Sequence, residues 1–210
     1  MKIAVLGGSF NPIHKGHLFL AEKEKNSLGY EKILFVPSYI SPFKQKIQEI
    51  SNKERICLLK KALKNKNSFA IENYELKQKG LSYTYHTICY LNKKYQKALQ
   101  KEKEKQFQKI GLILGLDLLE DFHKWHEYKK LAEQVYFIIA KRSIVENGNK
   151  NAELEKALKA FPFSYELLHN EYIDISSTDI RAKIKKKENW QPLVPERVAY
   201  YIQKKDLYGK

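Results

Sequence analysis

The sequence predicts an α/β protein in which a doubly wound parallel sheet forms a single domain over residues 1–210. Short apolar segments rich in β-branched residues alternate with longer segments whose apolar residues recur at helical spacing. Residues 110–115 are almost wholly apolar, which is typical of a central parallel strand covered on both faces. A chain of 210 residues can bury one substantial core, so no second domain is required.

Six short apolar runs are the expected strands, and each is bounded by glycine, proline or polar residues. The first is followed by Gly7 and Gly8, where a tight turn is expected because glycine adopts backbone conformations closed to other residues. The expected strands cover residues 2–6, 32–36, 69–71, 110–115, 135–140 and 172–175.

Helix boundaries are indicated by capping residues. Gly29 is expected to stop the first helix, and Ser51 begins a second with the spacing of a capping box. Ser82 is expected to cap a third helix, and Asp117 to start a fourth directly after the central strand. Further helices are expected over residues 152–161, after residue 176, and around residues 198–202.

Composition restricts the class of protein. The formal charge of +15, from 39 Lys plus Arg against 24 Asp plus Glu, favours anionic ligands. The lysines are scattered and are not interleaved with aromatic residues, so a nucleic-acid partner is not expected. Cys57 and Cys89 lack metal or redox spacing, and no segment has the length of a membrane span. A cytoplasmic protein away from membranes is expected, and a homo-oligomer is left open.

The first seventeen residues carry the clearest chemical pattern. An apolar strand ends in Gly7 and Gly8, and His14 and His17 then stand three residues apart at the start of a helix. Free N–H groups at a helix N-terminus bind anions, and imidazoles donate hydrogen bonds to phosphate. The pattern is neither a dinucleotide fingerprint nor a Walker loop. The alternative is an ordinary strand–turn–helix with two surface histidines.

A second candidate phosphate site lies near the end of the chain. Ser176, Ser177 and Thr178 place three hydroxyls over the first turn of a helix, and Arg181 follows one turn later. Backbone N–H groups, hydroxyls and a guanidinium fork together suit phosphate oxygens. Taken alone, the segment favours the interpretation as a serine-capped surface helix.

These two segments resemble the H-x-G-H and I-S-S-T-x-I-R signatures of the nucleotidyltransferase superfamily, and the string from Gly7 to His17 resembles its form in nicotinate-nucleotide adenylyltransferases. The resemblance implies a Rossmann-like sheet and transfer of an adenylyl group from ATP to nicotinate mononucleotide. It assigns catalytic roles to His14, His17, Lys44 and Arg181. It assigns ATP and phosphate binding to Gly7, Gly8, Ser9, Phe10, Gly16, Ser176, Ser177 and Thr178.

The middle of the chain resembles the same family at the segments that border its nicotinate pocket. The resemblance places Tyr83, Thr84, Asp117 and Trp125 around nicotinate mononucleotide, with the tryptophan stacking on or walling the pyridine. A helix cap and a core aromatic are the structural alternatives for Asp117 and Trp125. The family usually has histidine where this chain has Phe43, so the loop before Lys44 departs from the pattern.

Catalysis in this family consists of positioning and charge stabilisation, so Mg²⁺ is expected to accompany ATP, and no protein metal site is expected. Other acceptors remain open, namely nicotinamide mononucleotide, phosphopantetheine, or a polyol or choline phosphate in a cytidylyl transfer. A non-catalytic nucleotide or RNA binder of the same fold is the alternative from another class. The convergence of His14, His17 and Arg181 favours an enzyme.

Overall fold

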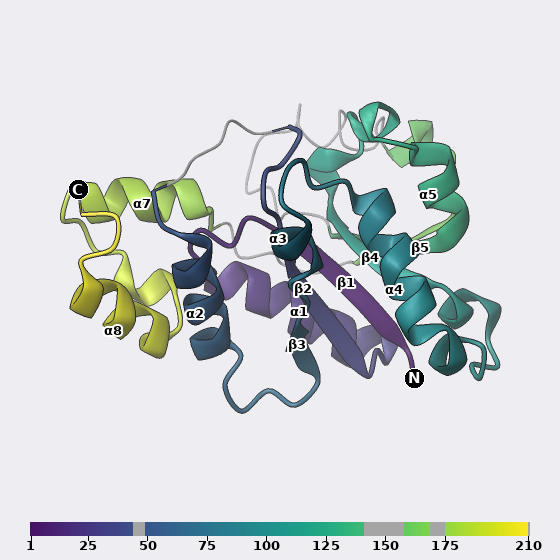
Figure 1. Cartoon of the computed structure of the whole chain (residues 1–210), viewed down its shortest axis with the longest axis horizontal. Coiled ribbons are helices and arrows are strands. Elements are labelled where there is room, and N and C mark those ends of the chain that lie inside the picture. The colour runs from purple at the N-terminus through teal and green to yellow at the C-terminus, as the bar shows by residue number, and fades with distance from the viewer. Residues whose placement is uncertain (44–48, 141–157, 169–174, 210) are drawn as a thin grey trace.

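The computed structural model describes residues 1–43, 49–140, 158–168 and 175–209. Within them a parallel sheet has the strand order β3-β2-β1-β4-β5-β6, which confirms the Rossmann-like, doubly wound fold (Figure 1). The strands are β1 (Ile3–Gly8), β2 (Lys32–Pro37), β3 (Phe69–Ile71), β4 (Ile110–Gly115), β5 (Val135–Ala140) and β6 (Tyr165–Leu168).

The strand order reverses direction between β1 and β4, which are neighbours although about a hundred residues separate them. Leu6 pairs with Ile113 in this register, so both strands end at the same edge of the sheet. In open α/β sheets, ligands bind at the carboxyl edge where such a reversal occurs. The topology therefore places a candidate site between the ends of β1 and β4.

Helices cover both faces of the sheet. The α-helices are α1 (Lys15–Leu28), α2 (Asn52–Ala62), α3 (Tyr74–Gln78), α4 (Thr84–Leu99), α5 (Tyr128–Gln134), α7 (Ser177–Lys185) and α8 (Glu196–Lys205). Short 3₁₀ turns are η1 (Lys105–Gln108), η2 (Leu116–Leu118), η3 (Phe122–Lys124) and η4 (Gln191–Leu193). In Figure 1, α7 and α8 lie at the left of the sheet, and α4 and α5 at the right.

Side chains alternate along each strand and so build two cores. Leu6 enters the core that contains residues of α1, α2, α7 and α8, including Leu59 and Val198. The preceding residue, Val5, enters the opposite core with Ile88 of α4 and Leu131 of α5. Burial on both faces explains why the central strands are continuous apolar runs.

Several predicted boundaries are confirmed because local chemistry determines them. Gly29 ends α1 with a φ of 68°, in the left-handed region that favours glycine. Ser51 and Ser176 cap α2 and α7, since each hydroxyl accepts the backbone N–H three residues later. The predicted last helix is α8.

Other predicted boundaries are wrong. Gly7 and Gly8 continue β1, and the chain turns only after them, around the cis Asn11–Pro12 bond. Ser82 does not cap α4, which begins after Tyr83, because the Ser82 hydroxyl accepts the Tyr39 backbone N–H at 2.8 Å. The short helix α3 was not predicted, since its five residues bury no side chain.

The α-helix predicted from Asp117 is replaced by η2 and η3. Buried Leu116, Leu119 and Phe122 recur every third residue, which matches a 3₁₀ turn better than an α-helix. The strand β6 was not predicted. The strand expected at 172–175 lies mostly outside the described residues. The helix expected at 152–161 also lies mostly outside them, although residues 158–160 are helical. In the described part of the chain, no helix has the length and apolar character needed to cross a membrane.

Candidate active site

A cavity of about 420 Å³ opens at the carboxyl edge of the sheet, where β1 and β4 end. Twelve of the sixteen residues predicted for the site line it: Gly7, Gly8, Ser9, His14, His17, Tyr83, Thr84, Trp125, Ser176, Ser177, Thr178 and Arg181. Phe10 and Gly16 lie outside the lining. Lys44 and the side chain of Asp117 are outside what the structure describes, although the Asp117 backbone follows β4 directly in η2.

His14 and His17 meet at the N-terminus of α1. Their rings stack with centroids 3.6 Å apart and an angle of 28° between the planes. The backbone N–H of His14 donates to His17 Nδ1 at 3.3 Å. Because an accepting nitrogen carries no proton, the ring proton of His17 lies on Nε2, which is then a donor. We expect this arrangement to present imidazole N–H groups beside the N-terminus of α1.

Phe10 supports the loop from beneath instead of lining the cavity. Its side chain is fully buried, packs edge-on against His17 with centroids 4.9 Å apart, and also contacts Phe35. A Cβ on Gly8 would lie 3.3 Å from the Phe10 ring. A larger residue at Gly8 would therefore push this ring and the adjacent histidine.

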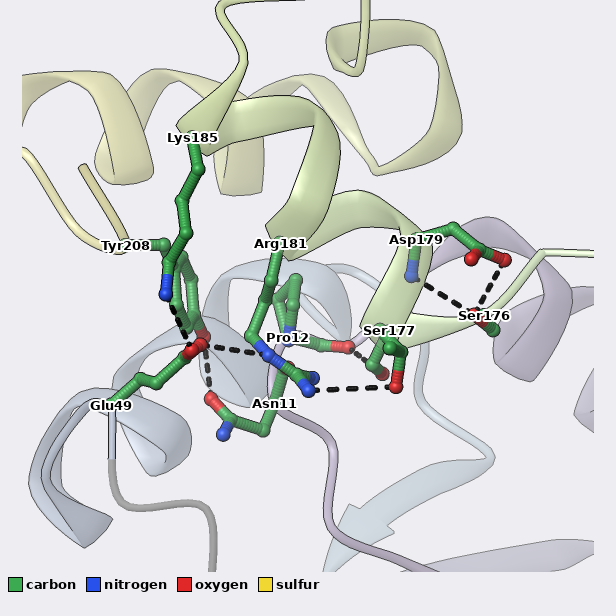
Figure 2. A network of polar contacts seen from close by, with 10 residues as sticks. Asn11, Pro12, Glu49, Ser176, Ser177, Asp179, Arg181, Lys185 and Tyr208 are labelled. Atoms are coloured by element: carbon green, nitrogen blue, oxygen red, sulfur yellow. Dashed lines mark hydrogen bonds and ion pairs between the residues drawn. The ribbon is translucent and has the colours of Figure 1, made fainter. Parts of the chain in front are cut away.

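The N-terminus of α7, from the other end of the chain, lines the cavity. Its Ser177 lies beside Pro12 (Figure 2). The Ser176 hydroxyl donates to Asp179 Oδ2 at 2.6 Å, and the Ser177 hydroxyl donates to the Pro12 carbonyl at 2.9 Å. Thr178 Oγ1 accepts from Arg181, so its own O–H can still donate. We therefore expect an anion here to meet Thr178 and backbone N–H groups more than the two serine hydroxyls.

Arg181 is buried, and three protein groups hold its guanidinium (Figure 2). Nη1 donates to the Asn11 carbonyl at 2.8 Å, and Nη2 donates to Thr178 Oγ1 at 3.4 Å. Nε lies 2.7 Å from Glu49 Oε2, and Lys185 Nζ lies 3.0 Å from the other oxygen of Glu49. A guanidinium has five N–H donors, so these contacts orient the group without using all of them.

The C-terminal segment reaches the same network. The Tyr208 hydroxyl donates to Asn11 Oδ1 at 2.8 Å, and both residues are buried. Burial raises the pKa of Tyr208 far above its ordinary value, so the hydroxyl stays a donor throughout the physiological range. Neither Asn11 nor Tyr208 was among the residues predicted for the site, and no local pattern relates two residues 197 positions apart.

Arg55 on α2 also lines the cavity and was not predicted. Its guanidinium donates to the Ser9 carbonyl at 2.7 Å and to Asn52 Oδ1 at 2.6 Å. Burial lowers the pKa of Arg55, and the neighbouring acidic groups Tyr208 and Glu75 act in the opposite direction. The sequence did contain a signal for Arg55. It stands four residues before buried Leu59, and therefore on the apolar face of the helix, where a charged residue is unusual.

Glu75 places a carboxylate in the wall of the same cavity. Burial raises its pKa, while hydrogen bonds from Thr87 and Ser82 and the charge of Arg55 act in the opposite direction. The Thr87 hydroxyl donates to Glu75 Oε1 at 2.7 Å. Within the described residues, no group of three or more His, Cys, Asp or Glu side chains could hold a metal ion.

Aromatic residues form the other end of the cavity. Trp125 is half-buried against Phe122, with ring centroids 5.4 Å apart. The neighbouring His126 lies over the Tyr83 ring at 4.4 Å, and both line the cavity. Phe43 faces Trp125 from the loop after β2. The cavity thus has a polar end, built around His14 and Arg181, and an aromatic end, built around Trp125.

Residues 5–183 match the family model described as cytidylyltransferase-like. The chain is 34% identical over 99% of its length to a protein of Treponema pallidum (strain Nichols) named as a probable nicotinate-nucleotide adenylyltransferase, of which 99% is covered. It belongs to the nicotinate-nucleotide adenylyltransferase family. A relative from Hydrogenobaculum sp. with the same name is 35% identical over the whole of both chains.

Solved structures show the same fold at lower identity. The nicotinic acid mononucleotide adenylyltransferase of Plasmodium falciparum, complexed with NaAD, superposes with a TM-score of 0.76 at 22% identity, covering 98% of this chain and 96% of that one. The same enzyme complexed with APC gives a TM-score of 0.73 at 21% identity. These structures agree with the family assignment at the level of the fold.

Proposed function

We propose that this chain transfers the adenylyl group of ATP to nicotinate mononucleotide, forming nicotinate adenine dinucleotide and releasing pyrophosphate. The observation that carries the proposal is a cavity that has both a donor-rich end and an aromatic end, at the sheet edge where α/β proteins bind nucleotides. Relatives that match the whole chain are named for this reaction. One cavity of this kind suits two nucleotides that react with each other.

The reaction requires no covalent intermediate with the protein. A phosphate oxygen of the mononucleotide attacks the α-phosphorus of ATP, and the bond from that phosphorus to the β-phosphate bridging oxygen breaks. His14 and His17 are proposed to hold the α and bridging oxygens, on which negative charge grows. Arg181, Thr178 and the N-terminus of α7 are proposed to hold the departing pyrophosphate, and Lys44 to bind an anionic group of the substrates.

Gly7, Gly8 and Ser9 are proposed to line the ATP site with their backbone, because β1 ends at Gly8 and all three residues lie in the cavity wall. Phe10 and Gly16 are proposed to act through the shape of this loop and helix. Around the mononucleotide, Trp125 is proposed to stack on the pyridine, with Tyr83, Thr84 and Asp117 bordering the pocket.

Mg²⁺ is proposed to enter with the triphosphate. The groups at the polar end of the cavity are imidazole, guanidinium, hydroxyl and backbone N–H groups, which suit phosphate oxygens better than they suit Mg²⁺, a cation that prefers carboxylate and phosphate oxygens. Mg²⁺ commonly retains several waters and binds substrate phosphates, so a protein cage is not needed. When bound, it neutralises the charge of the triphosphate.

A pyrophosphate-release assay tests the function. ATP is supplied with nicotinate mononucleotide, nicotinamide mononucleotide or phosphopantetheine in parallel reactions. We expect kcat/KM for nicotinate mononucleotide to exceed that for the amide by about a hundredfold, because an amide leaves buried donors without a carboxylate acceptor. Equal use of the amide, or a preference for phosphopantetheine, would show that nicotinate mononucleotide is not the specific acceptor.

A further inference from the structure

A carboxylate lies behind the arginine at the polar end of the cavity. Arg181 lines the cavity, whereas Glu49 and Lys185 lie outside the lining. Arg181 Nε lies 2.7 Å from Glu49 Oε2, and Lys185 Nζ lies 3.0 Å from Glu49 Oε1 (Figure 2). Glu49 therefore contacts Arg181 from outside the cavity.

Two contacts of Arg181 fix the plane of its guanidinium. Glu49 lies at Nε, and the Asn11 carbonyl accepts a hydrogen bond from Nη1 at 2.8 Å. Both nitrogens belong to one planar group, so an acceptor at each of them restrains rotation of that group. The contact of Nη2 with Thr178 is longer, at 3.4 Å, and restrains the group less. Without Glu49, the guanidinium would be held mainly by the Asn11 carbonyl, around which it could turn.

The pair between Glu49 and Arg181 is largely shielded from water. The exposed fraction of the side chain is 9% for Arg181 and 25% for Glu49. Water and salt weaken ion pairs at the surface, and a partly buried pair is weakened less. Lys185 binds the second carboxylate oxygen, so Glu49 is held between two cations. The carboxylate thus has a defined position relative to Arg181.

We propose that Glu49 is a positioning residue that orients Arg181 toward the departing pyrophosphate, an inference that rests on the proposed function. A guanidinium fork binds two phosphate oxygens at once only when its plane is aligned with them. Glu49 sets this plane before the substrate binds, so the donors are already in place when charge grows on the leaving group. The negative charge of Glu49 by itself opposes phosphate binding. Its benefit to the reaction therefore comes from orientation.

Steady-state kinetics of two variants separate orientation from charge. Glu49→Gln keeps an oxygen acceptor and loses the charge, whereas Glu49→Ala loses both. With saturating substrates, kcat should fall about tenfold in Glu49→Ala and stay within about threefold of the parent in Glu49→Gln. The KM for nicotinate mononucleotide should be unchanged in both variants. Glu188→Ala is the matched control, because it removes another carboxylate that pairs with a lysine of α7, Lys183, at 3.3 Å.

A double-mutant cycle shows whether Glu49 acts through Arg181. Lysine keeps a positive charge but has no planar fork to orient, so Arg181→Lys should lower kcat by itself. Adding Glu49→Ala to that variant should change kcat by less than about twofold. A loss of the same size in both backgrounds would show that Glu49 acts independently of Arg181, and it would overturn the proposal.

The binding of pyrophosphate alone provides a readout that does not depend on turnover. Measured by titration calorimetry without nucleotides, the Kd for pyrophosphate should rise about fivefold in Glu49→Ala and should not exceed the parent value in Glu49→Gln. Equal or tighter binding by Glu49→Ala would show that the carboxylate acts only as a negative charge, which overturns the positioning role. Circular dichroism of each variant establishes that a raised Kd does not come from loss of the fold.

The failure of this inference and the failure of the proposed function give different results. A parent protein that does not bind pyrophosphate overturns the role of Arg181 and with it the role of Glu49. A parent that binds pyrophosphate, with the expected changes in the two Glu49 variants, but releases none from ATP and nicotinate mononucleotide overturns the proposed acceptor. In that case the positioning of Arg181 by Glu49 still holds.

Discussion

The two ends of the cavity are built in different ways. At the polar end, buried side chains from distant parts of the chain hold each other: Arg181 binds the Asn11 carbonyl, and Tyr208 binds the Asn11 side chain. At the aromatic end, rings project from a loop and a 3₁₀ turn, and Phe43 is half-exposed. The polar groups are already oriented, whereas one wall of the aromatic end still has room to adjust.

This difference matches the chemistry proposed for each end. Stabilising charge in a transition state requires donors whose positions are set before the reaction, and buried hydrogen bonds provide that. Binding a flat ring requires contact area more than a fixed angle, so exposed rings suffice. We therefore expect substitutions at the polar end to lower kcat and substitutions at the aromatic end to raise KM.

The largest effect is expected from the histidines. His17→Ala should lower kcat by about a hundredfold or more, since one donor to a developing oxyanion contributes about 3 kcal/mol. His14→Ala should have an effect of similar size. Both are measured with saturating ATP and nicotinate mononucleotide, and unfolding curves should show a folded protein. A near-normal kcat in both variants would show that the two histidines do not form a phosphate site.

Trp125→Ala tests the aromatic end. Loss of the fixed ring should raise the KM for nicotinate mononucleotide about tenfold, while the KM for ATP should change by less than about twofold. The two constants are measured by varying one substrate while the other is saturating. A defect confined to ATP would show that the two ends have been assigned to the wrong substrates.

Tyr208→Phe tests whether the C-terminal segment supports the polar end. Removing the hydroxyl takes a hydrogen bond from buried Asn11 and should lower the free energy of unfolding by about 1 kcal/mol. Denaturant unfolding measures this change. Tyr200→Phe on α8 is the control, because Tyr200 is 63% exposed. Equal stability of the two variants would show that the Tyr208–Asn11 hydrogen bond contributes nothing.

The smallest effect concerns Glu75, whose pKa burial raises in the folded state. A group with a raised folded pKa contributes stability that is lost as the pH rises through that pKa, because the folded state resists ionisation. At pH values above the raised pKa, Glu75→Gln should therefore have a higher unfolding temperature than the parent. This difference should vanish below pH 4.5, the ordinary pKa of the group. Thermal unfolding between pH 4 and 8 measures it. Exposed Glu120→Gln is the control, and an advantage that does not depend on pH would contradict the explanation.

Much of the polar end could be predicted from the sequence because helix N-termini have local signals. His14, Ser176 and Arg181 stand at positions that neighbouring residues already mark as the start of a helix. The alternation of strands and helices also predicts that these residues lie close together, because the carboxyl ends of parallel strands meet at the same edge of the sheet. The roles of these residues in the reaction remain predictions.

The missed features have a common cause. The 3₁₀ turns after β4 depend on burying Leu116, Leu119 and Phe122 against a core that only the folded sheet provides. Strand β6 was missed because Tyr165 to Leu168 is a short segment whose strand form depends on pairing with β5. In both segments, tertiary packing outweighed the local preference.

The sequence by itself determined the positions of β1 to β5 and the caps of α2 and α7, and it predicted phosphate binding at two helix starts, because each depends on residues within a few positions. Only the tertiary structure decided that Tyr208 lies on Asn11, that Arg55 holds the Ser9 carbonyl, and that Phe43 faces Trp125. Such contacts join segments that the strand order and the burial of side chains bring together, so no spacing of residues in the sequence predicts them.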